Sequence, residues 1–474
     1  MSERLEQVLE REAPVWGVRP VPPEHRRLGG LDFAILWGDL GIGLLVLVTG
    51  ALLVPALGLR AAVGAIVVGS LLGCIPLALV GMAGAREGVP GMVLLRPVLG
   101  VRGSFVPTVL NLAQLLGWTA FELWAMALVA SRVTGPLFGI DSFFIWLGVA
   151  ALVCLALSLG GPVLVVRRWM KRFGAWVIAA VAAWITVRLF ATADVAGLWG
   201  KPGAGGFPGF WSGVDLVIAM PVSWIPLVAD YNRFARRGVS SAGGTYVGYL
   251  VANVWFYSLG ALLILGAGVS EPSVTGIADG ILALAGGIVV LLALLVGETD
   301  EAFADVYSAA VSSQNLAPRI RQRPAIVAVT AIGVGVAAWL FGQPGEGVLT
   351  YEFFLLLIGS VFVPLFAVFV ADYFVLRHRD HDERALFDGL GPYRYSGGFR
   401  IAAILAWALG FVSYHAVAPT PLPGWQRFVD AVLGPPLFGG EAPASIVAFV
   451  VGFAAHLVLA GLVRARRRGR AAAR

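Results

Sequence analysis

Long apolar runs, separated by short polar segments, follow one another along almost the whole chain. Twelve of these runs have the length of about 20 residues that an α-helix needs to cross the hydrocarbon core of a bilayer. They cover residues 31–57, 61–84, 103–133, 143–161, 173–193, 213–235, 243–269, 277–313, 324–341, 350–376, 399–418 and 443–464. The pattern predicts an all-α polytopic membrane protein with 12 transmembrane helices, because a helix satisfies its own backbone hydrogen bonds in lipid.

Composition agrees with this prediction and argues against other classes of protein. Of the 474 residues, 58% are hydrophobic and only 13% are charged, whereas a soluble domain has about 25% charged residues. The net charge of +6 comes from basic residues scattered between the apolar runs, which indicates membrane topology and no nucleic-acid partner. The two cysteines, Cys74 and Cys154, lie in apolar runs without the spacing of a disulfide framework or a metal site.

The basic residues also predict the orientation of the chain. If both termini are cytoplasmic, the inner segments hold 29 of the 34 Lys and Arg residues, as the positive-inside rule requires. We therefore expect a multi-pass protein of the cell (inner or plasma) membrane. Residues 1–30 would form a cytoplasmic N-terminal segment, residues 465–474 a basic cytoplasmic tail, and the amphipathic segment 84–103 a short helix along the inner membrane surface.

Two of the predicted helices contain residues that interrupt a helix. The first has three glycines around Asp39, in the sequence GDLGIG, and the sixth has Pro221 and Pro226. Irregular backbone at membrane depth is tolerated where it lines a cavity, and breaks at matching places in two halves are typical of inverted-repeat transporters. The sequence predicts five-helix repeats at residues 31–193 and 213–376, followed by two additional helices at 399–464. The alternative is two kinked helices with no site.

Acidic residues lie within the apolar run of the eighth helix. At about 100° per residue, Glu298, Glu301 and Asp305 share one narrow face with Ser308 and Ser312. Each charge in hydrocarbon costs at least about 2.5–3.5 kcal/mol, so we expect these groups to face water, a cation or one another. A substrate or cation site is favoured, with Glu298 and Glu301 able to relay a proton or cation. A water-filled vestibule without a ligand is the alternative.

The third helix presents Gln114, Trp118 and Glu122 on one face. An indole beside a carboxylate suits a flat heterocycle, which stacks on the ring while the carboxylate accepts its N–H hydrogens. The alternative is that Trp118 packs in the core and Glu122 pairs with an interior arginine. Asp372 lies outside these two faces and is interpreted as a relay residue. The alternative, which is more common for such groups, is an interior carboxylate whose oxygens all have partners.

Several stretches resemble the nucleobase–cation symporters of the purine–cytosine permease and hydantoin transporter type. They are FAILWGDLGIG, VLGVRGSFVPT, QLLGWTAFELW, PVSWIPLVADYNRFAR and ADVYSAAVSSQN, and the resemblance covers about residues 14–420. It implies a LeuT-like five-plus-five inverted repeat with two extra helices. The fourth and fifth stretches look most similar to the branch assigned to hydroxymethylpyrimidine, a precursor of thiamine.

The resemblance implies a set of site residues. The substrate-binding positions that it matches are Gln114, Trp118, Glu122, Gly43, Met220, Trp224 and Asp305. Glu122 and Asp305 stand where the family has amides, which favours a substrate with N–H donors such as an aminopyrimidine. The implied cation ligands are the carbonyl groups of Asp39, Ile42 and Val296, with Thr299 and Asp300. Because Asp300 replaces a hydroxyl, both Na⁺ and H⁺ remain open as the coupling ion.

The expected function is import of a small nitrogen heterocycle by cation symport, without a cofactor. Hydroxymethylpyrimidine or a related aminopyrimidine is the first expectation, and a cytosine, purine or allantoin permease is the alternative. A membrane-embedded enzyme is disfavoured, because the chain has no metal-ligand spacing, no Gly-x-Ser-x-Gly and no phosphate-binding loop. The aromatic residues suit a flat solute better than the ion flux of a channel. The sequence leaves the oligomeric state open, a monomer included.

Overall fold

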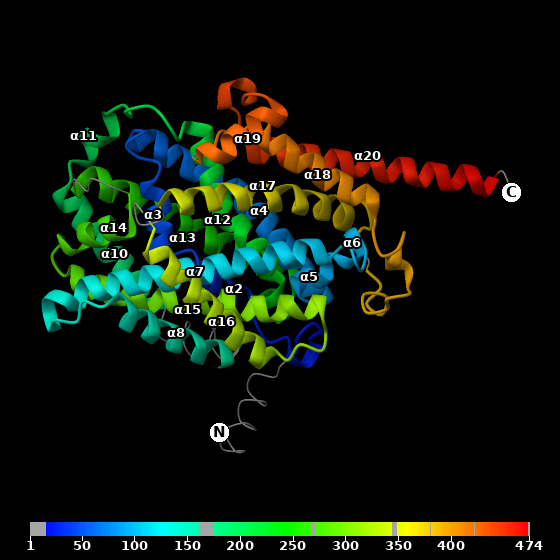
Figure 1. The fold of residues 1–474 in the computed structure, drawn as a ribbon, viewed down its shortest axis with the longest axis horizontal. Helices are drawn as coiled ribbons and strands as arrows, with labels where there is room; N and C mark the ends of the chain where they lie inside the picture. The colour runs from blue at the N-terminus through cyan, green and yellow to red at the C-terminus, as the bar shows by residue number, and fades with distance from the viewer. Residues whose placement is uncertain are drawn as a thin grey trace, which may run out of the picture.

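The computed structural model describes residues 16–160, 175–267, 272–343, 348–379, 381–420 and 422–472. Throughout these ranges the regular elements are helices (Figure 1). Those that coincide with the predicted spans are α2 (Gly30–Asp39) with α3 (Leu44–Ala51), α4 (Leu59–Glu87), α7 (Phe105–Phe138), α8 (Phe143–Gly160), α10 (Ala175–Thr192), α12 (Phe210–Asn232), α13 (Gly238–Ala267), α15 (Gly287–Leu316), α16 (Gln322–Phe341), α17 (Val348–Val370), α18 (Ile401–His415) and α20 (Ala444–Ala472).

Short helices connect these elements. They are α5 (Gly91–Leu94), α6 (Arg96–Leu99), α11 (Val195–Gly200), α14 (Val274–Leu282) and α19 (Pro423–Leu433), and α17 continues as the π-helical turn η4 (Ala371–Leu376). Within the described ranges, eight helices are long and apolar enough to cross a membrane, or nine if α2 and α3 form one span. The helices α10 and α18 are shorter, and α15 carries several acidic residues. A multi-pass membrane protein is the result, whereas the number of 12 crossings stays a prediction.

The first span is interrupted where the sequence has its glycines. Helices α2 and α3 meet at an angle of 63°, with Leu40–Gly43 between them. Gly43 has an extended backbone and precedes the first residue of α3. Asp39 is the last residue of α2, so its side chain lies directly at the break.

The prediction of a matching break in the sixth span is wrong. Helix α12 runs without interruption from Phe210 to Asn232, with Pro221 and Pro226 inside it. Pro221 has no N–H to offer the carbonyl of Val217 four residues earlier. The hydroxyl of Tyr257, on α13, lies 3.5 Å from that carbonyl and donates to it instead. Neighbouring helices also bury α12 from Ser212 to Asn232, which helps to hold it straight.

Two other boundaries differ from the prediction. The eighth span does not begin at residue 277, because α14 ends at Leu282 and α15 begins at Gly287. Gly286 separates them with a positive φ of 82°, a conformation that favours glycine.

The segment 84–103 does not lie on the surface as an amphipathic helix. Its short helices α5 and α6 are buried, and Arg96 donates to Asn315 and to the carbonyl of Leu386.

The helices divide into a buried core and a peripheral pair. Helix α12 packs on α4 and α17, α13 packs on α2, α3 and α4, and α15 packs on α7, α8 and α16. The C-terminal helices α18 and α20 pack on each other and on α17, and α20 projects past the bundle at its C-terminal end (Figure 1). In its most apolar stretch, helix α20 has only 22% of its residues buried, whereas helix α12 has 100% of them buried. The acidic residues of α15 therefore lie among the core helices.

Candidate functional site

Six buried carboxyl groups gather where α2, α7 and α15 meet. Each is at most 5% exposed, and the charged groups closest to Glu301 are other members of the set. We call this set the six-carboxyl cluster: Asp39, Glu122, Glu298, Asp300, Glu301 and Asp305. The structure thus brings together acidic residues that the sequence analysis assigned separately to substrate, cation and relay roles.

The break between α2 and α3 lies directly against α15. The backbone N–H of Leu44 donates to Oε1 of Glu298. A Cβ atom at Gly43 would collide with the carboxylate oxygens of Glu298 and Glu301. Gly43 is therefore required for close approach, and the start of α3 directs its first free N–H groups toward the acids.

Two pairs of carboxyl groups face each other inside the cluster. The side chain of Asp39 lies within hydrogen-bonding reach of Asp300, and the side chain of Glu122 lies within reach of Asp305. Two carboxylates cannot donate to each other, so the Glu122–Asp305 pair needs a shared proton or a bound cation between its oxygens. The geometry therefore offers a place between α7 and α15 where positive charge or a hydrogen-bond donor is needed.

For Asp39, Glu122, Glu298, Glu301 and Asp305, the part of the chain that the structure describes provides no basic partner. Its ion pairs join Arg86 to Glu87, Arg132 to Asp279, and Asp372 to Arg377, Arg400 and His456. Both oxygens of Glu122, Oε2 of Glu298 and Oε1 of Glu301 accept no hydrogen bond from described residues. The described residues therefore give no support to the alternative that interior arginines neutralise these acids.

Helix α7 contributes the amide and the indole. Nε2 of Gln114 donates to Oδ1 of Asn111 and to the carbonyl of Ser223 on α12, both at 2.9 Å, so it ties α7 to α12. Oε1 of Gln114 and Nε1 of Trp118 are buried without a described partner. The Trp118 ring packs edge-on against Tyr351 and Phe354 of α17, with centroid distances of 6.0 and 5.3 Å. Both side chains keep polar atoms free for a ligand.

Tyr351 joins the site although the sequence analysis missed it. Its hydroxyl lies 2.8 Å from Oγ1 of Thr49, donates to the carbonyl of Leu45 at 3.2 Å and lies 3.7 Å from Sδ of Met220. The residue connects α17 with α3 and α12, next to Trp118. A single tyrosine in an apolar span has no periodic signal, so only the packing of distant helices reveals it.

The two positions assigned to α12 lie in different surroundings. Met220 is buried and contacts Tyr351. Trp224 is buried against Trp37 of α2, with ring centroids 5.9 Å apart at 78°. Trp118 and Trp224 therefore belong to separate ring clusters, and a substrate held between them stays a prediction.

The candidate cation ligands lie next to the break. The carbonyl of Asp39 accepts from the N–H of Ile42 at 3.0 Å, and the carbonyl of Val296 accepts from the Thr299 hydroxyl at 2.6 Å. Each oxygen keeps a lone pair for a further ligand. A cavity of about 310 Å³ between α2, α10 and α13 reaches Asp39 and Ile42. In the described ranges, no three His, Cys, Asp or Glu side chains are arranged to hold a metal ion.

The remaining polar residues of the α15 stripe connect helices. Oγ of Ser312 accepts from Asn111 of α7 at 2.8 Å, and Asn315 donates to Ser104 and Thr108. Along α15 the stripe therefore changes from acids that have no basic partner within the described ranges to hydroxyl and amide groups hydrogen-bonded to α7.

The fold of this chain matches the folds of solved transporters. Over 94% of this chain and 96% of the other, it matches the structure of Mhp1, a nucleobase-cation-symport-1 family transporter in a closed conformation with bromovinylhydantoin bound, with a TM-score of 0.76 and 18% identity. It also matches a Na⁺-coupled sialic acid symporter with a TM-score of 0.63 and 12% identity, over 92% of this chain and 91% of that one. At these identities the likeness concerns the fold alone.

The chain belongs to the family described as permease for cytosine/purines, uracil, thiamine, allantoin, whose model matches residues 20–432. It is 29% identical to a candidate purine-cytosine permease, YxlA, of Bacillus subtilis (strain 168), over 79% of this chain and 82% of that protein. It is 23% identical to the hydantoin permease of Microbacterium maritypicum, over 82% of each chain. It is 24% identical to the cytosine permease of Escherichia coli (strain K12), over 78% of this chain and 80% of the other. The family consists of permeases, which agrees with a transporter and not an enzyme.

Proposed function

We propose that this protein imports a small nitrogen heterocycle with N–H or amine donors, together with a cation. The observation that carries the proposal is the burial of Asp39, Glu122, Glu298, Glu301 and Asp305 in the core, without a basic partner for these five acids among the described residues. A cluster of this kind is stabilised by cations and by hydrogen-bond donors from a ligand. Membership in the permease family supports the same class of cargo.

The substrate would lie between α7, α15 and the α2–α3 break. Its ring stacks on Trp118, and Glu122 and Asp305 accept its amine hydrogens, replacing the proton that their carboxyl groups otherwise share. Oε1 of Gln114 is a further acceptor. Gly43 lets the substrate and α15 approach the backbone of the break, and Met220 and Trp224 line the side formed by α12.

The coupling cation would lie beside Asp39 and Asp300. The carbonyls of Asp39, Ile42 and Val296 and the hydroxyl of Thr299 are hard oxygen ligands of the kind that Na⁺ prefers. A proton shared by the Asp39–Asp300 pair would satisfy the same charge requirement. Glu298 and Glu301 connect this position with the substrate position and are the candidate relay.

Two substrates remain in competition. The motifs of α12 and α15 favour hydroxymethylpyrimidine, whereas the relatives that carry named substrates favour a purine, cytosine, hydantoin or allantoin. Cytosine and hydroxymethylpyrimidine both carry an exocyclic amine beside a ring nitrogen, which suits the Glu122–Asp305 pair. Hydantoin offers ring N–H groups but no exocyclic amine.

Binding and uptake assays with purified protein in liposomes test this proposal. Glu122→Gln and Asp305→Asn each remove a charged acceptor, and a hydrogen bond to a charged group contributes about 1.5–3 kcal/mol. We expect the affinity for the aminopyrimidine that is transported to fall by about 10- to 100-fold in each variant. Asp430→Asn, on the peripheral helix α19, is the matched control and should change nothing.

Competition between radiolabelled cytosine, hydroxymethylpyrimidine and hydantoin separates the substrates, and imposed Na⁺ or pH gradients separate the coupling ions. Uptake should be saturable and gradient-dependent, and it should deliver the solute chemically unaltered. Unchanged affinity in both acidic-site variants would show that the substrate position is wrong. Conductance without saturation would indicate a channel instead.

A further inference from the structure

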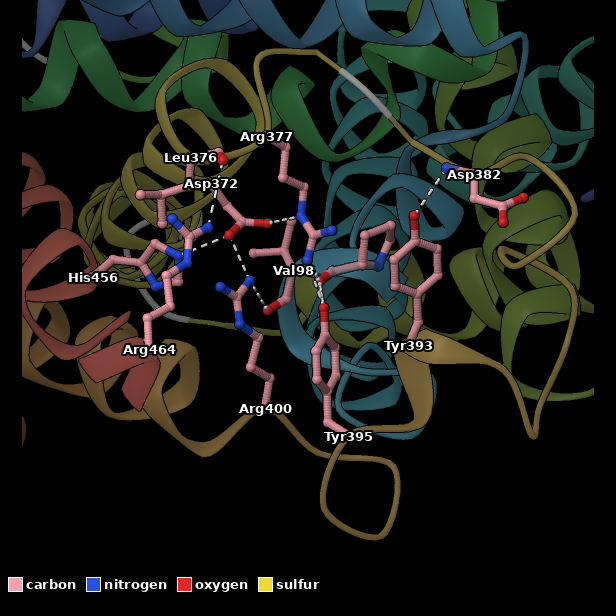
Figure 2. Close-up of polar contacts among 11 residues, drawn as sticks. Val98, Asp372, Leu376, Arg377, Asp382, Tyr393, Tyr395, Arg400, His456 and Arg464 are labelled. Atoms are coloured by element: carbon pink, nitrogen blue, oxygen red, sulfur yellow. Dashed lines mark hydrogen bonds and ion pairs between the residues drawn. The ribbon is translucent and has the colours of Figure 1, made fainter. Parts of the chain in front are cut away.

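A polar pocket whose lining contains no member of the six-carboxyl cluster lies at the end of α17, and Figure 2 shows several of its residues. It has a volume of about 500 Å³ and is enclosed by η4, the connection to α18, the start of α18 and α20. We call it the arginine pocket, because the guanidinium groups of Arg377, Arg400 and Arg464 line it. The residues that line it include no acidic side chain.

One buried carboxylate partly neutralises this positive charge from behind. Asp372 is fully buried and accepts from Nε of Arg377 at 2.6 Å and from Nη1 of Arg400 at 2.5 Å. Its Oδ1 also lies 3.1 Å from Nε2 of His456. Because both oxygens of Asp372 are occupied, the three guanidinium groups keep an excess of positive charge toward the pocket.

The donors that remain are suitably placed for an anion. Arg400 uses only Nη1, so its Nε and Nη2 have no acceptor among the described residues. Arg464 makes a single long contact, from Nη2 to the carbonyl of Leu376 at 3.5 Å. A guanidinium with two adjacent free N–H groups matches two oxygens of a phosphate group.

Hydrogen bonds hold the part of the pocket that carries Tyr395. The hydroxyl of Tyr395 donates to the carbonyl of Pro97 at 2.6 Å and accepts from Nη2 of Arg377 at 2.5 Å. The carbonyl of Gly398 accepts from the backbone N–H groups of Arg102 and Gly103, both at 3.0 Å. The loop that carries Tyr395 is therefore fixed against the segment before α7, and the pocket is formed without a ligand.

The position of the pocket corresponds to the level of lipid headgroups. Helix α20 is mainly apolar from Ala444 to Val463, a length that spans the hydrocarbon core, and Arg464 is its first arginine; Ser445 and His456 are the polar residues within this stretch. Ile401 and Val463 line the pocket and are 54% and 44% exposed. The arginines thus lie where the apolar surface of α18 and α20 ends, and acyl chains have an apolar surface to follow.

We propose that the arginine pocket binds the phosphate group of an anionic phospholipid. Arg400 and Arg464 contact the phosphate oxygens, Arg377 contributes charge from behind, and the acyl chains run along Ile401 and Val463. The distribution of basic residues predicts that this lipid belongs to the cytoplasmic leaflet. Bound there, it joins α20 and the 377–400 connection to the end of α17.

Native mass spectrometry of the purified full chain tests the proposal, with phosphatidylglycerol and phosphatidylcholine as probes. A basic side chain near an anionic headgroup changes affinity by about fivefold. We expect Arg464→Gln to weaken phosphatidylglycerol binding by about fivefold and Arg400→Gln with Arg464→Gln by about twentyfold. Arg464→Lys should retain most of the binding, and phosphatidylcholine binding should be weak and unaffected.

Arg427→Gln, an exposed arginine on α19, is the control and should bind phosphatidylglycerol as the native protein does. If the double variant unfolds, phosphatidylglycerol binding by the single variant Arg464→Gln, whose side chain is exposed, tests the proposal. Equal binding of the two lipids, or equal phosphatidylglycerol binding by native protein and Arg464→Gln, would overturn the proposal. If millimolar inorganic phosphate displaced the lipid and bound with the same affinity, the site would be one for free phosphate and the assignment to a lipid would be wrong.

Discussion

Two regions of this protein surround their buried carboxylates in opposite ways. Asp372, at the end of α17, lies between Arg377, Arg400 and His456, which use both of its oxygens (Figure 2). In the six-carboxyl cluster, the five acids other than Asp300 have no basic partner among the described residues, and two pairs of its carboxyl groups face each other directly.

This difference indicates what each region is for. A buried carboxylate that is already paired has little to offer a ligand, because a new partner would have to displace an existing one. Carboxylates without partners repel one another and gain free energy from any cation or donor that reaches them. We therefore interpret Asp372 as structural and the cluster as the place where cargo and coupling ion bind.

The largest expected effect comes from removing the charge of Asp372. Asp372→Asn leaves the partly buried Arg377 and Arg400 without the fully buried carboxylate that pairs with them, and breaking a buried ion pair costs about 3–5 kcal/mol, an upper bound for this partly exposed site. Thermal or denaturant unfolding of the purified protein measures this loss of stability. Glu301→Gln is the matched variant in the cluster, and we expect it to leave the free energy of unfolding unchanged or to increase it, since the described charges that act on Glu301 are other carboxylates. Equal losses in the two variants would contradict the comparison.

A smaller effect is expected where the cluster touches the α2–α3 break. Gly43→Ala forces a methyl group against the carboxylates of Glu298 and Glu301, and overpacking of this kind costs about 1–3 kcal/mol. We expect substrate affinity and cation-dependent uptake to fall by about 5- to 100-fold in liposomes. Gly148→Ala, in α8, where an added Cβ meets nothing within 4 Å, is the control and should transport normally. Normal uptake by Gly43→Ala would show that the break need not approach α15 during transport.

The smallest effect concerns the connection next to Asp372. Burial, with the nearby charge of Arg377, lowers the pKa of His381 from 6.5 to about 4. Below pH 6.5 the unfolded chain binds a proton at His381 that the folded protein does not, so stability falls as the pH decreases toward 4. Between pH 7 and 5.5 we expect a loss of about 1 kcal/mol from this residue. His381→Gln should flatten the dependence of the unfolding midpoint on pH, and an unchanged profile would assign the loss to other groups.

Much of the fold follows from the sequence because its causes are local. Each predicted span coincides with a helix or a helix pair, since about 20 apolar residues determine a membrane helix almost without reference to the rest of the chain. The break at Gly43 was predicted for the same reason. The break in α12 was predicted wrongly, because the partner that satisfies the carbonyl of Val217 is Tyr257 on another helix.

Part of the site was predictable because placing a carboxylate in a membrane helix costs free energy. Glu122, Glu298 and Asp305 were identified because carboxylates are rare in apolar runs, and the helical period placed the last two on one face. The contact between Glu122 and Asp305 joins α7 to α15, and nothing in the local sequence encodes it. Tyr351 gave no signal, because an aromatic residue in an apolar span is ordinary until its neighbours are known.

The sequence alone determined that the chain is helical, that it lies in a membrane and that acids are buried in it, because hydrophobicity and charge act on each segment separately. Only the tertiary structure decided which of those acids are neutralised. Arg400 and His456 reach Asp372 from 28 and 84 residues away, whereas no such residue from the described chain reaches Glu301. Electrostatic pairing depends on distances of a few ångströms between segments far apart in the chain, and these distances are fixed only when the helices pack.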